Sequence, residues 1–167
     1  MSKEYEALVA LRDYLRAYLD PAPQPALADG QVVLAYDLYP DIDAMPHPVM
    51  LYIFLEQTRI EQSSLNMSQI TEEITIYLLV KNKPISELFQ AVHDYCAAVQ
   101  NAINKDRTLN GSLAECEISE INYANELLGV SRAFGAEMRL ALKYERTTIY
   151  YPDENLLQNE GLMPIGG

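Results

Sequence analysis

The sequence predicts a single α+β domain, in which a mostly antiparallel sheet of four to five strands packs against two helices. The chain has 167 residues, 49% of them apolar, which is enough for one hydrophobic core. Residues 135–145 alternate between apolar and polar side chains, as is typical of a strand with one face on a core. Strand-like runs lie on both sides of one long helical pattern, which favours an antiparallel sheet covered by helices. We expect the domain to span 1–148, followed by a C-terminal tail at 149–167.

The N-terminal third predicts one helix and two strands. Apolar residues recur at three- and four-residue spacings over 4–19, which predicts a helix that follows Ser2 and ends before Pro21. The predicted buried stripe is Tyr5, Leu8, Val9, Leu11, Leu15, Tyr18 and Leu19. Residues 21–48 are rich in proline and are predicted to form a loop or arm with one short strand at 31–39. The apolar run at 49–57 predicts a strand that is buried, or covered, on both faces.

The remainder of the chain predicts a hairpin, a long helix and two final strands. Residues 59–68 are polar and are predicted to connect the strand at 49–57 to one at 69–81. A helix is expected from an N-cap at Ser86 to about residue 104. Its predicted buried stripe is Leu88, Phe89, Val92, Tyr95, Cys96, Val99 and Ile103. Asn110-Gly111 indicates a turn, and strands are expected at 113–123 and 135–145, with 127–129 in the connection between them.

The charge of the chain excludes some classes of partner. The formal net charge is −12, spread along the sequence, and such a field repels phosphate backbones, so we expect no specific nucleic-acid binding. The excess of acid is explained equally well by solubility or by an acidic lumen or partner surface. The most apolar stretches reach about ten residues, against roughly twenty needed to span a bilayer, so no membrane partner is expected. The first residues carry no secretory signal pattern, which predicts a cytoplasmic protein.

No catalytic, cofactor or metal motif is present in the sequence, and we expect no enzyme. The two histidines, His47 and His93, have no zinc-ligand spacing to a cysteine or to one another. His93 and Cys96 share a helical face, but core packing explains Cys96 better than a thiolate–imidazole pair, and Cys116 is likewise expected to be reduced and buried. Acidic side chains recur at Asp37, Asp41 and Asp43, but not with the spacing of a calcium loop.

Carboxylates also cluster on the predicted strands. Glu72 and Glu73 are adjacent, and three more acidic residues lie close together at Glu115, Glu117 and Glu120. Paired carboxylates can perform acid/base chemistry when one is buried and its pKa is raised. Because these residues alternate with core positions, we expect them on a solvated strand face.

Tyrosine dominates the aromatic content, with twelve residues against three phenylalanines and no tryptophan. Tyrosine is common at strand rims and protein interfaces, although strand propensity alone explains the pattern equally well. The polar face of 135–145 mixes acidic and basic residues, which makes it a candidate partner-facing surface as well as a solvated one. The candidate subunit-interface residues are Tyr36, Tyr39, Tyr77, Arg139, Lys143, Tyr150 and Tyr151.

The order of these elements resembles the tail terminator and tail completion (head–tail joining) proteins of long-tailed bacteriophages. The local likeness lies in Leu109-Asn110-Gly111-Ser112-Leu113, in Ile118-Ser119-Glu120-Ile121-Asn122-Tyr123, and in residues 136–144. It covers roughly 84–146, and the N-terminal half follows the family only in outline. The proline-rich segment at 21–48 and the tail after Thr147 depart from the compact family pattern.

The resemblance implies a structural virion protein that assembles into a homo-oligomeric ring, commonly a hexamer. Such a ring ends polymerisation of the tail tube and joins tail to head, so the implied partners are the tail tube protein and the head connector protein. The implied locations are the host cytoplasm during assembly and then the virion tail. We expect neighbouring subunits to meet through the strand at 69–81, the arm at 31–48 and the final segment. The alternative is a small cytosolic binding domain with an apolar pocket and no virion role.

Overall fold

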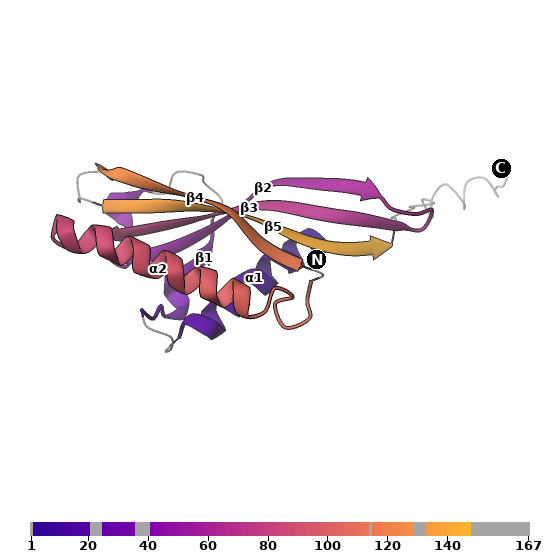
Figure 1. Ribbon diagram of the computed structural model, residues 1–167, viewed down its shortest axis with the longest axis horizontal. Helices are drawn as coiled ribbons and strands as arrows, with labels where there is room; N and C mark the ends of the chain where they lie inside the picture. The colour runs from indigo at the N-terminus through magenta and orange to yellow at the C-terminus, as the bar shows by residue number, and fades with distance from the viewer. Residues whose placement is uncertain (1, 21–24, 36–40, 114, 129–132, 148–167) are drawn as a thin grey trace.

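The protein is an α+β domain built around one five-stranded sheet, as the sequence predicts (Figure 1). The computed structural model describes residues 2–20, 25–35, 41–113, 115–128 and 133–147. The strands are β1 (Val32–Leu34), β2 (Val49–Gln62), β3 (Met67–Lys81), β4 (Glu115–Leu128) and β5 (Ala133–Thr147), in the spatial order β1-β2-β3-β5-β4. Only the β1–β2 pair is parallel. The helices α1 (Lys3–Leu19) and α2 (Ile85–Lys105) pack on one face of the sheet.

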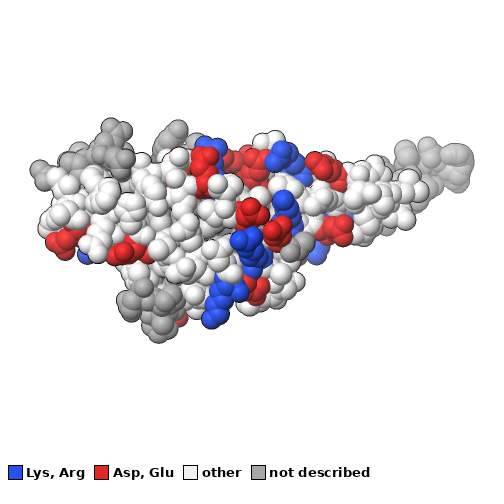
Figure 2. All heavy atoms as spheres, viewed as in Figure 1, with Lys and Arg blue, Asp and Glu red and all other residues white. Residues whose placement is uncertain are grey.

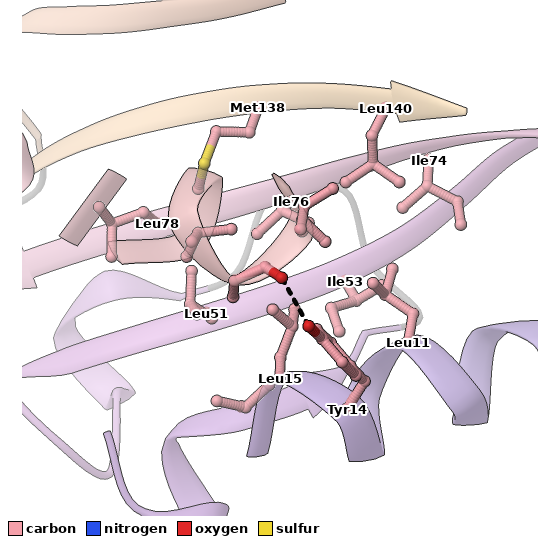
Figure 3. Close-up of a cluster of buried hydrophobic side chains, with 14 of the residues drawn as sticks. Leu11, Tyr14, Leu15, Leu51, Ile53, Ile74, Ile76, Leu78, Met138 and Leu140 are labelled. Atoms are coloured by element: carbon pink, nitrogen blue, oxygen red, sulfur yellow. Dashed lines mark hydrogen bonds between the residues drawn. The ribbon is translucent and has the colours of Figure 1, made fainter. Parts of the chain in front are cut away.

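Helix α1 begins where the sequence predicts, because the Ser2 hydroxyl accepts a hydrogen bond from the backbone N–H of Tyr5 (3.2 Å). Its buried stripe differs from the prediction: Val9 and Tyr18 are only partly buried, and Ala7 is buried although it was not predicted to be. Tyr5 is exposed, whereas Tyr14 is buried and its hydroxyl donates to the backbone carbonyl of Ala102 in α2 (2.6 Å; Figure 3). This bond joins the two helices and gives the buried phenol the partner it requires.

The main core lies between the helices and the inner face of the sheet. Figure 3 shows α1 side chains meeting inward-pointing residues of β2, β3 and β5. The side chains labelled there, all buried, are Leu11, Tyr14, Leu15, Leu51, Ile53, Ile74, Ile76, Leu78, Met138 and Leu140. On the strands these positions alternate with residues of the other face, so the period-two pattern correctly identified the inner face.

Helix α2 begins two residues earlier than expected. Pro84 is the N-cap, so Ser86 lies inside the first turn, and the prediction that it caps the helix is wrong. The Pro84 carbonyl instead accepts from the N–H groups of Glu87 and Leu88, both at 2.9 Å. Phe89 was predicted to be buried but is half exposed, because it lies at the border of the stripe, next to β4.

The hairpin formed by β2 and β3 is longer than the sequence indicates. Residues 59–68 were expected to be a connection, but β2 continues to Gln62 and β3 starts at Met67. Ile60 pairs with Ile70 and Gln62 with Ser68, after a bulge between Leu55 and Gln57. Polar residues occur on both faces of this outer half, which projects beyond the helices in Figure 1. A strand solvated on both faces lacks the alternating pattern by which strands are recognised.

The remaining strands differ from the predictions in length. The strand expected at 31–39 is β1 alone, with Gln31 in a short 3₁₀ turn (Asp29–Gln31) and residues 36–39 outside the described part. At the other end, β4 continues through Leu128, so Leu127 and Leu128 are not in a connection as expected. Pairing with β5 is irregular between Ala124 and Leu128, which explains why the alternation fades there.

A second, smaller core covers the outer face of the sheet beside β2. Met45, Met50 and Leu79 form it, and four partly buried residues pack around them: Val33, Ile42, Tyr52 and Tyr77. The short 3₁₀ turn Ile42–Ala44 is held there by Lys81, whose ammonium donates to the Ile42 carbonyl (3.1 Å). The expectation that the apolar run at 49–57 is covered on its second face is therefore confirmed.

Candidate assembly surface

The sheet has two open edges. Strand β4 pairs only with β5, so its other edge meets no described strand. On the opposite side, β1 pairs with only Leu51, Tyr52 and Ile53 of β2. The outer half of β2, residues 55–62, therefore has no described strand beside it on that side. Unpaired strand edges present rows of backbone donors and acceptors, which makes them sites for strand addition.

Apolar side chains are exposed along the outer half of the hairpin. Ile60 on β2 is 57% exposed, and Leu65 in the turn is 84% exposed. Leu55, at the start of this outer half, is 38% exposed. The three side chains lie along the segment where the edge of β2 is open, so apolar contact and backbone pairing are available at the same surface.

The outer face of the sheet forms an open, charged trough of about 600 Å³ across β2, β3, β5 and β4. Arg59 pairs with Glu73 (2.7 Å), and Arg139 lies 3.8 Å from Glu120. In Figure 2, acidic and basic side chains lie together across the middle of the molecule. These ion pairs are largely exposed, so they shape the surface and contribute little to stability.

Three of the predicted interface residues share this outer face. Arg139 lies opposite Thr75, Lys143 lies opposite Thr71, and Tyr77 lies opposite Glu137. Arg139 and Lys143 line the trough, whereas Tyr77 is half-buried in the second core with its ring edge-on to Phe54 (6.0 Å between centroids). The structure therefore separates Tyr77 from the two basic residues.

The other predicted interface residues, Tyr36, Tyr39, Tyr150 and Tyr151, lie outside the described residues. The strand at 69–81, which was expected to contact a neighbouring subunit, cannot do so by edge pairing, because β3 lies between β2 and β5 and is paired on both sides. Of the arm expected to reach a neighbouring subunit, Ile42 and Met45 instead pack on the sheet of their own chain.

An aromatic stack beside β4 was not predicted. The His93 ring stacks on Tyr123 of β4 (4.3 Å between centroids) and contacts Phe89 (4.7 Å). Cys96 is not part of it, because Cys96 is buried in the main core and burial raises the pKa of its thiol to about 12. Cys116 is buried with its pKa raised to about 12 in the same way, so both cysteines are small core residues, as predicted.

Glu72 does not lie on a solvated face, and that prediction is wrong. Its side chain is 0% exposed on the inner face of the sheet, between the positions of Ile70 and Ile74. Glu73, next to it, does face the outer trough. Adjacent residues of a strand point to opposite faces, so one of the two carboxylates had to point toward the helices.

Among the described residues, two kinds of feature are absent. No group of three or more His, Cys, Asp or Glu side chains gathers there in a way that could hold a metal ion. Neither described helix is long and apolar enough to cross a membrane.

No protein-family model matches the chain, and comparison with curated protein sequences finds no match either.

Proposed function

We propose that this chain is a structural subunit of a bacteriophage tail that assembles into a homo-oligomeric ring, ends the tail tube and joins it to the head. The observation that carries the proposal is the pair of open sheet edges on opposite sides of one subunit. The sequence resemblance over 84–146 supplies the family, and the α+β fold agrees with it.

Ring formation follows from pairing different edges. If the open edge of β2 in one copy meets β4 of the next, each copy uses one of its two edges and leaves the other for the following neighbour. Such head-to-tail contacts close into a ring when the rotation per subunit divides a full turn. Ile60 and Leu65 would be covered at each contact, which adds apolar burial to the backbone hydrogen bonds. A net charge of −12 per subunit is compatible with a lumen through which DNA passes without binding.

The binding-domain alternative has less support. An apolar ligand needs a concave, largely apolar pocket. The outer trough is instead lined largely by charged residues, among them Glu56, Arg59, Glu73, Glu120 and Arg139. That surface suits a charged protein partner better than an apolar small molecule.

The test replaces an exposed apolar residue at the proposed contact. Ile60→Glu places a charge at the open edge of β2, where 57% of the side chain is already exposed, so we expect a folded monomer. The wild-type chain at tens of micromolar should give a ring by light scattering and negative-stain imaging. Ile85→Glu is the matched control, since Ile85 is 48% exposed at the start of α2, away from the hairpin.

Two results would contradict the proposal. One is a wild-type chain that stays monomeric both alone and with the tail tube protein encoded beside it. The other is a ring that persists in Ile60→Glu, which would place the contact on another surface. Neighbouring genes unrelated to virion assembly would remove the phage assignment while leaving the edge-pairing mechanism open to the same test.

A further inference from the structure

Glu72 is a carboxyl group that is completely buried on the inner face of the sheet. Among the described residues, neither of its carboxyl oxygens has a hydrogen bond of ordinary geometry. The hydroxyl of Tyr144, on the same inner face one strand away, is also buried and unpartnered. Buried polar groups are normally hydrogen-bonded because leaving them unpaired is costly, so a pair of such groups marks a special environment.

The groups that face Glu72 come from three elements. On β2, Thr58 lies directly opposite. On β5, Tyr144 and Arg146 follow Leu142, which is the residue paired with Glu72. On α1, Glu4 makes an ion pair with Arg146, and both side chains are largely buried. The carboxylate of Glu6, also on α1, raises the pKa of Tyr144. One cation therefore serves two carboxyl groups, Glu4 and Glu72.

The electrostatics favour a neutral Glu72 while Glu4 holds Arg146. Burial raises the pKa of Glu72 to about 7, and the Glu4 carboxylate raises it as well, against the opposing effects of Thr58 and Arg146. Burial and the charges of Glu72 and Glu4 also raise the pKa of Tyr144, so this phenol stays neutral. Glu72 therefore changes charge near neutral pH, whereas the Tyr144 phenol does not.

We propose that Glu72 is a proton-controlled latch on the first turn of α1. When Glu72 is neutral, Arg146 binds Glu4 and ties the start of α1 to β5. When Glu72 ionises, two carboxylates compete for one guanidinium. Glu72 is fixed in the middle of a central strand, whereas Glu4 lies in the first turn of a helix, so Glu4 is the one that separates. The inference does not depend on ring formation.

Release of the first turn would uncover a defined surface. Ala7 and Leu8 are the first buried residues of α1, and Tyr144 lies against this part of the helix beside a hollow of about 280 Å³. The hydrogen bonds that Ser2 accepts from the backbone N–H groups of Tyr5 and Glu6 are local to the helix and do not reach the sheet. A cap alone does not fix a helix end to a sheet, so the turn moves when the ion pair breaks.

The experiment measures amide hydrogen exchange of the full chain by NMR from about pH 5.5 to about pH 8.5. The protection factors of Tyr5 to Leu8 should fall about tenfold, with a midpoint near 7, while those of α2 amides around Val99 stay constant. Glu72→Gln should remove the pH dependence. Glu73→Gln, the neighbouring carboxylate on the opposite face, should retain it.

Two outcomes overturn the latch. The first is that the hydrogen-exchange protection factors of the first turn of α1 do not change with pH in the wild-type chain. The second is that the pH dependence of these protection factors, with its midpoint near 7, is still present in Glu72→Gln. Should Glu72→Gln fail to fold, the carboxyl carbon shift of Glu72 in the wild-type chain decides, because a midpoint below about pH 5.5 excludes the switch.

Discussion

Burying the carboxyl group of Glu72 costs free energy of folding. It lies on a central strand, is fully buried, and faces one arginine that already binds another carboxylate. A carboxyl group in such a place is better accommodated when protonated, because removing a charge from water costs more than removing a neutral acid. The side chain therefore makes stability depend on pH in the direction opposite to that of an ordinary salt-bridged acid.

Replacing Glu72 by glutamine should stabilise the protein at alkaline pH. The folded-state pKa of Glu72 is about 7, against 4.5 for the ordinary group, so the folded chain binds the extra proton between these values. Stability contributed by that proton is complete below about pH 4.5 and is lost as the pH rises through 7. Above this window, Glu72→Gln should exceed the wild-type stability by on the order of 3 kcal/mol. Urea unfolding at pH 5 and pH 8 measures the difference. A variant with the same pH slope as the wild type would show that Glu72 titrates normally.

The alternation of β3 already contained the signal for this residue. Glu72 has the parity of Ile70 and Ile74, and residues of one parity share a face. The prediction that Glu72 is solvated followed the general rule for acidic residues instead of the alternation of the strand, and it was wrong. The partner could not be predicted at all, because Arg146 and Glu4 are 142 residues apart in sequence and meet only through the packing of α1 on β5.

At the scale of elements, amphipathic segments were predicted well and solvated ones poorly. The inner half of β2 is an apolar run covered on both faces, and β5 alternates because the helices cover one of its faces; both patterns are visible in the sequence. Beyond Phe54 the strand β2 is largely exposed on both faces, so its alternating pattern disappears although the backbone pairing continues to Gln62 and Ser68. The proposed function requires the open edge of β2 at residues 55–62. This part of the site could not be predicted from the sequence.

The turn between α2 and β4 depends on backbone conformations that side chains disfavour. Leu109, Asn110 and Gly111 all have positive φ, with Gly111 at 81°. Asp106 holds the turn by accepting from the N–H groups of Thr108 (3.0 Å) and Asn110 (2.9 Å). The sequence pair Asn110-Gly111 predicted a turn correctly, because these residues tolerate the left-handed region best.

Gly111→Ala should destabilise this turn without any steric clash. No atom lies within 4 Å of the position that the new Cβ would occupy, so the cost arises from the positive φ alone. We expect a loss of about 1 kcal/mol in the free energy of unfolding. Ser112→Ala, at the next exposed position, is the control and should be close to neutral. Denaturant unfolding of both variants provides the comparison, and an unchanged Gly111→Ala would mean that the turn relaxes to another conformation.

At the scale of the whole molecule, strand order rather than strand content determines what can assemble. The sequence predicted the strands and their mostly antiparallel pairing, but the strand at 69–81, expected to contact a neighbouring subunit, is the central strand β3. Strand order depends on the parallel pairing of β1 with β2 and on the position of β5 between β3 and β4. Both are contacts between distant segments, which local periodicity does not record.

The net charge of −12 should make assembly increase with salt. Each copy carries the same excess of acid, so neighbouring subunits repel one another, whereas strand pairing and the burial of Ile60 and Leu65 are insensitive to screening. Raising the ionic strength from about 10 mM to about 150 mM shortens the Debye length from about 30 Å to about 8 Å. The assembled fraction, measured by light scattering at constant protein concentration, should therefore rise across this range. Ile60→Glu should remain monomeric at every salt concentration, because its defect lies in the contact itself. Dissociation of the wild-type assembly by salt would instead mean that ion pairs such as those of the outer trough hold the subunits together, and it would move the interface from the sheet edges to that face.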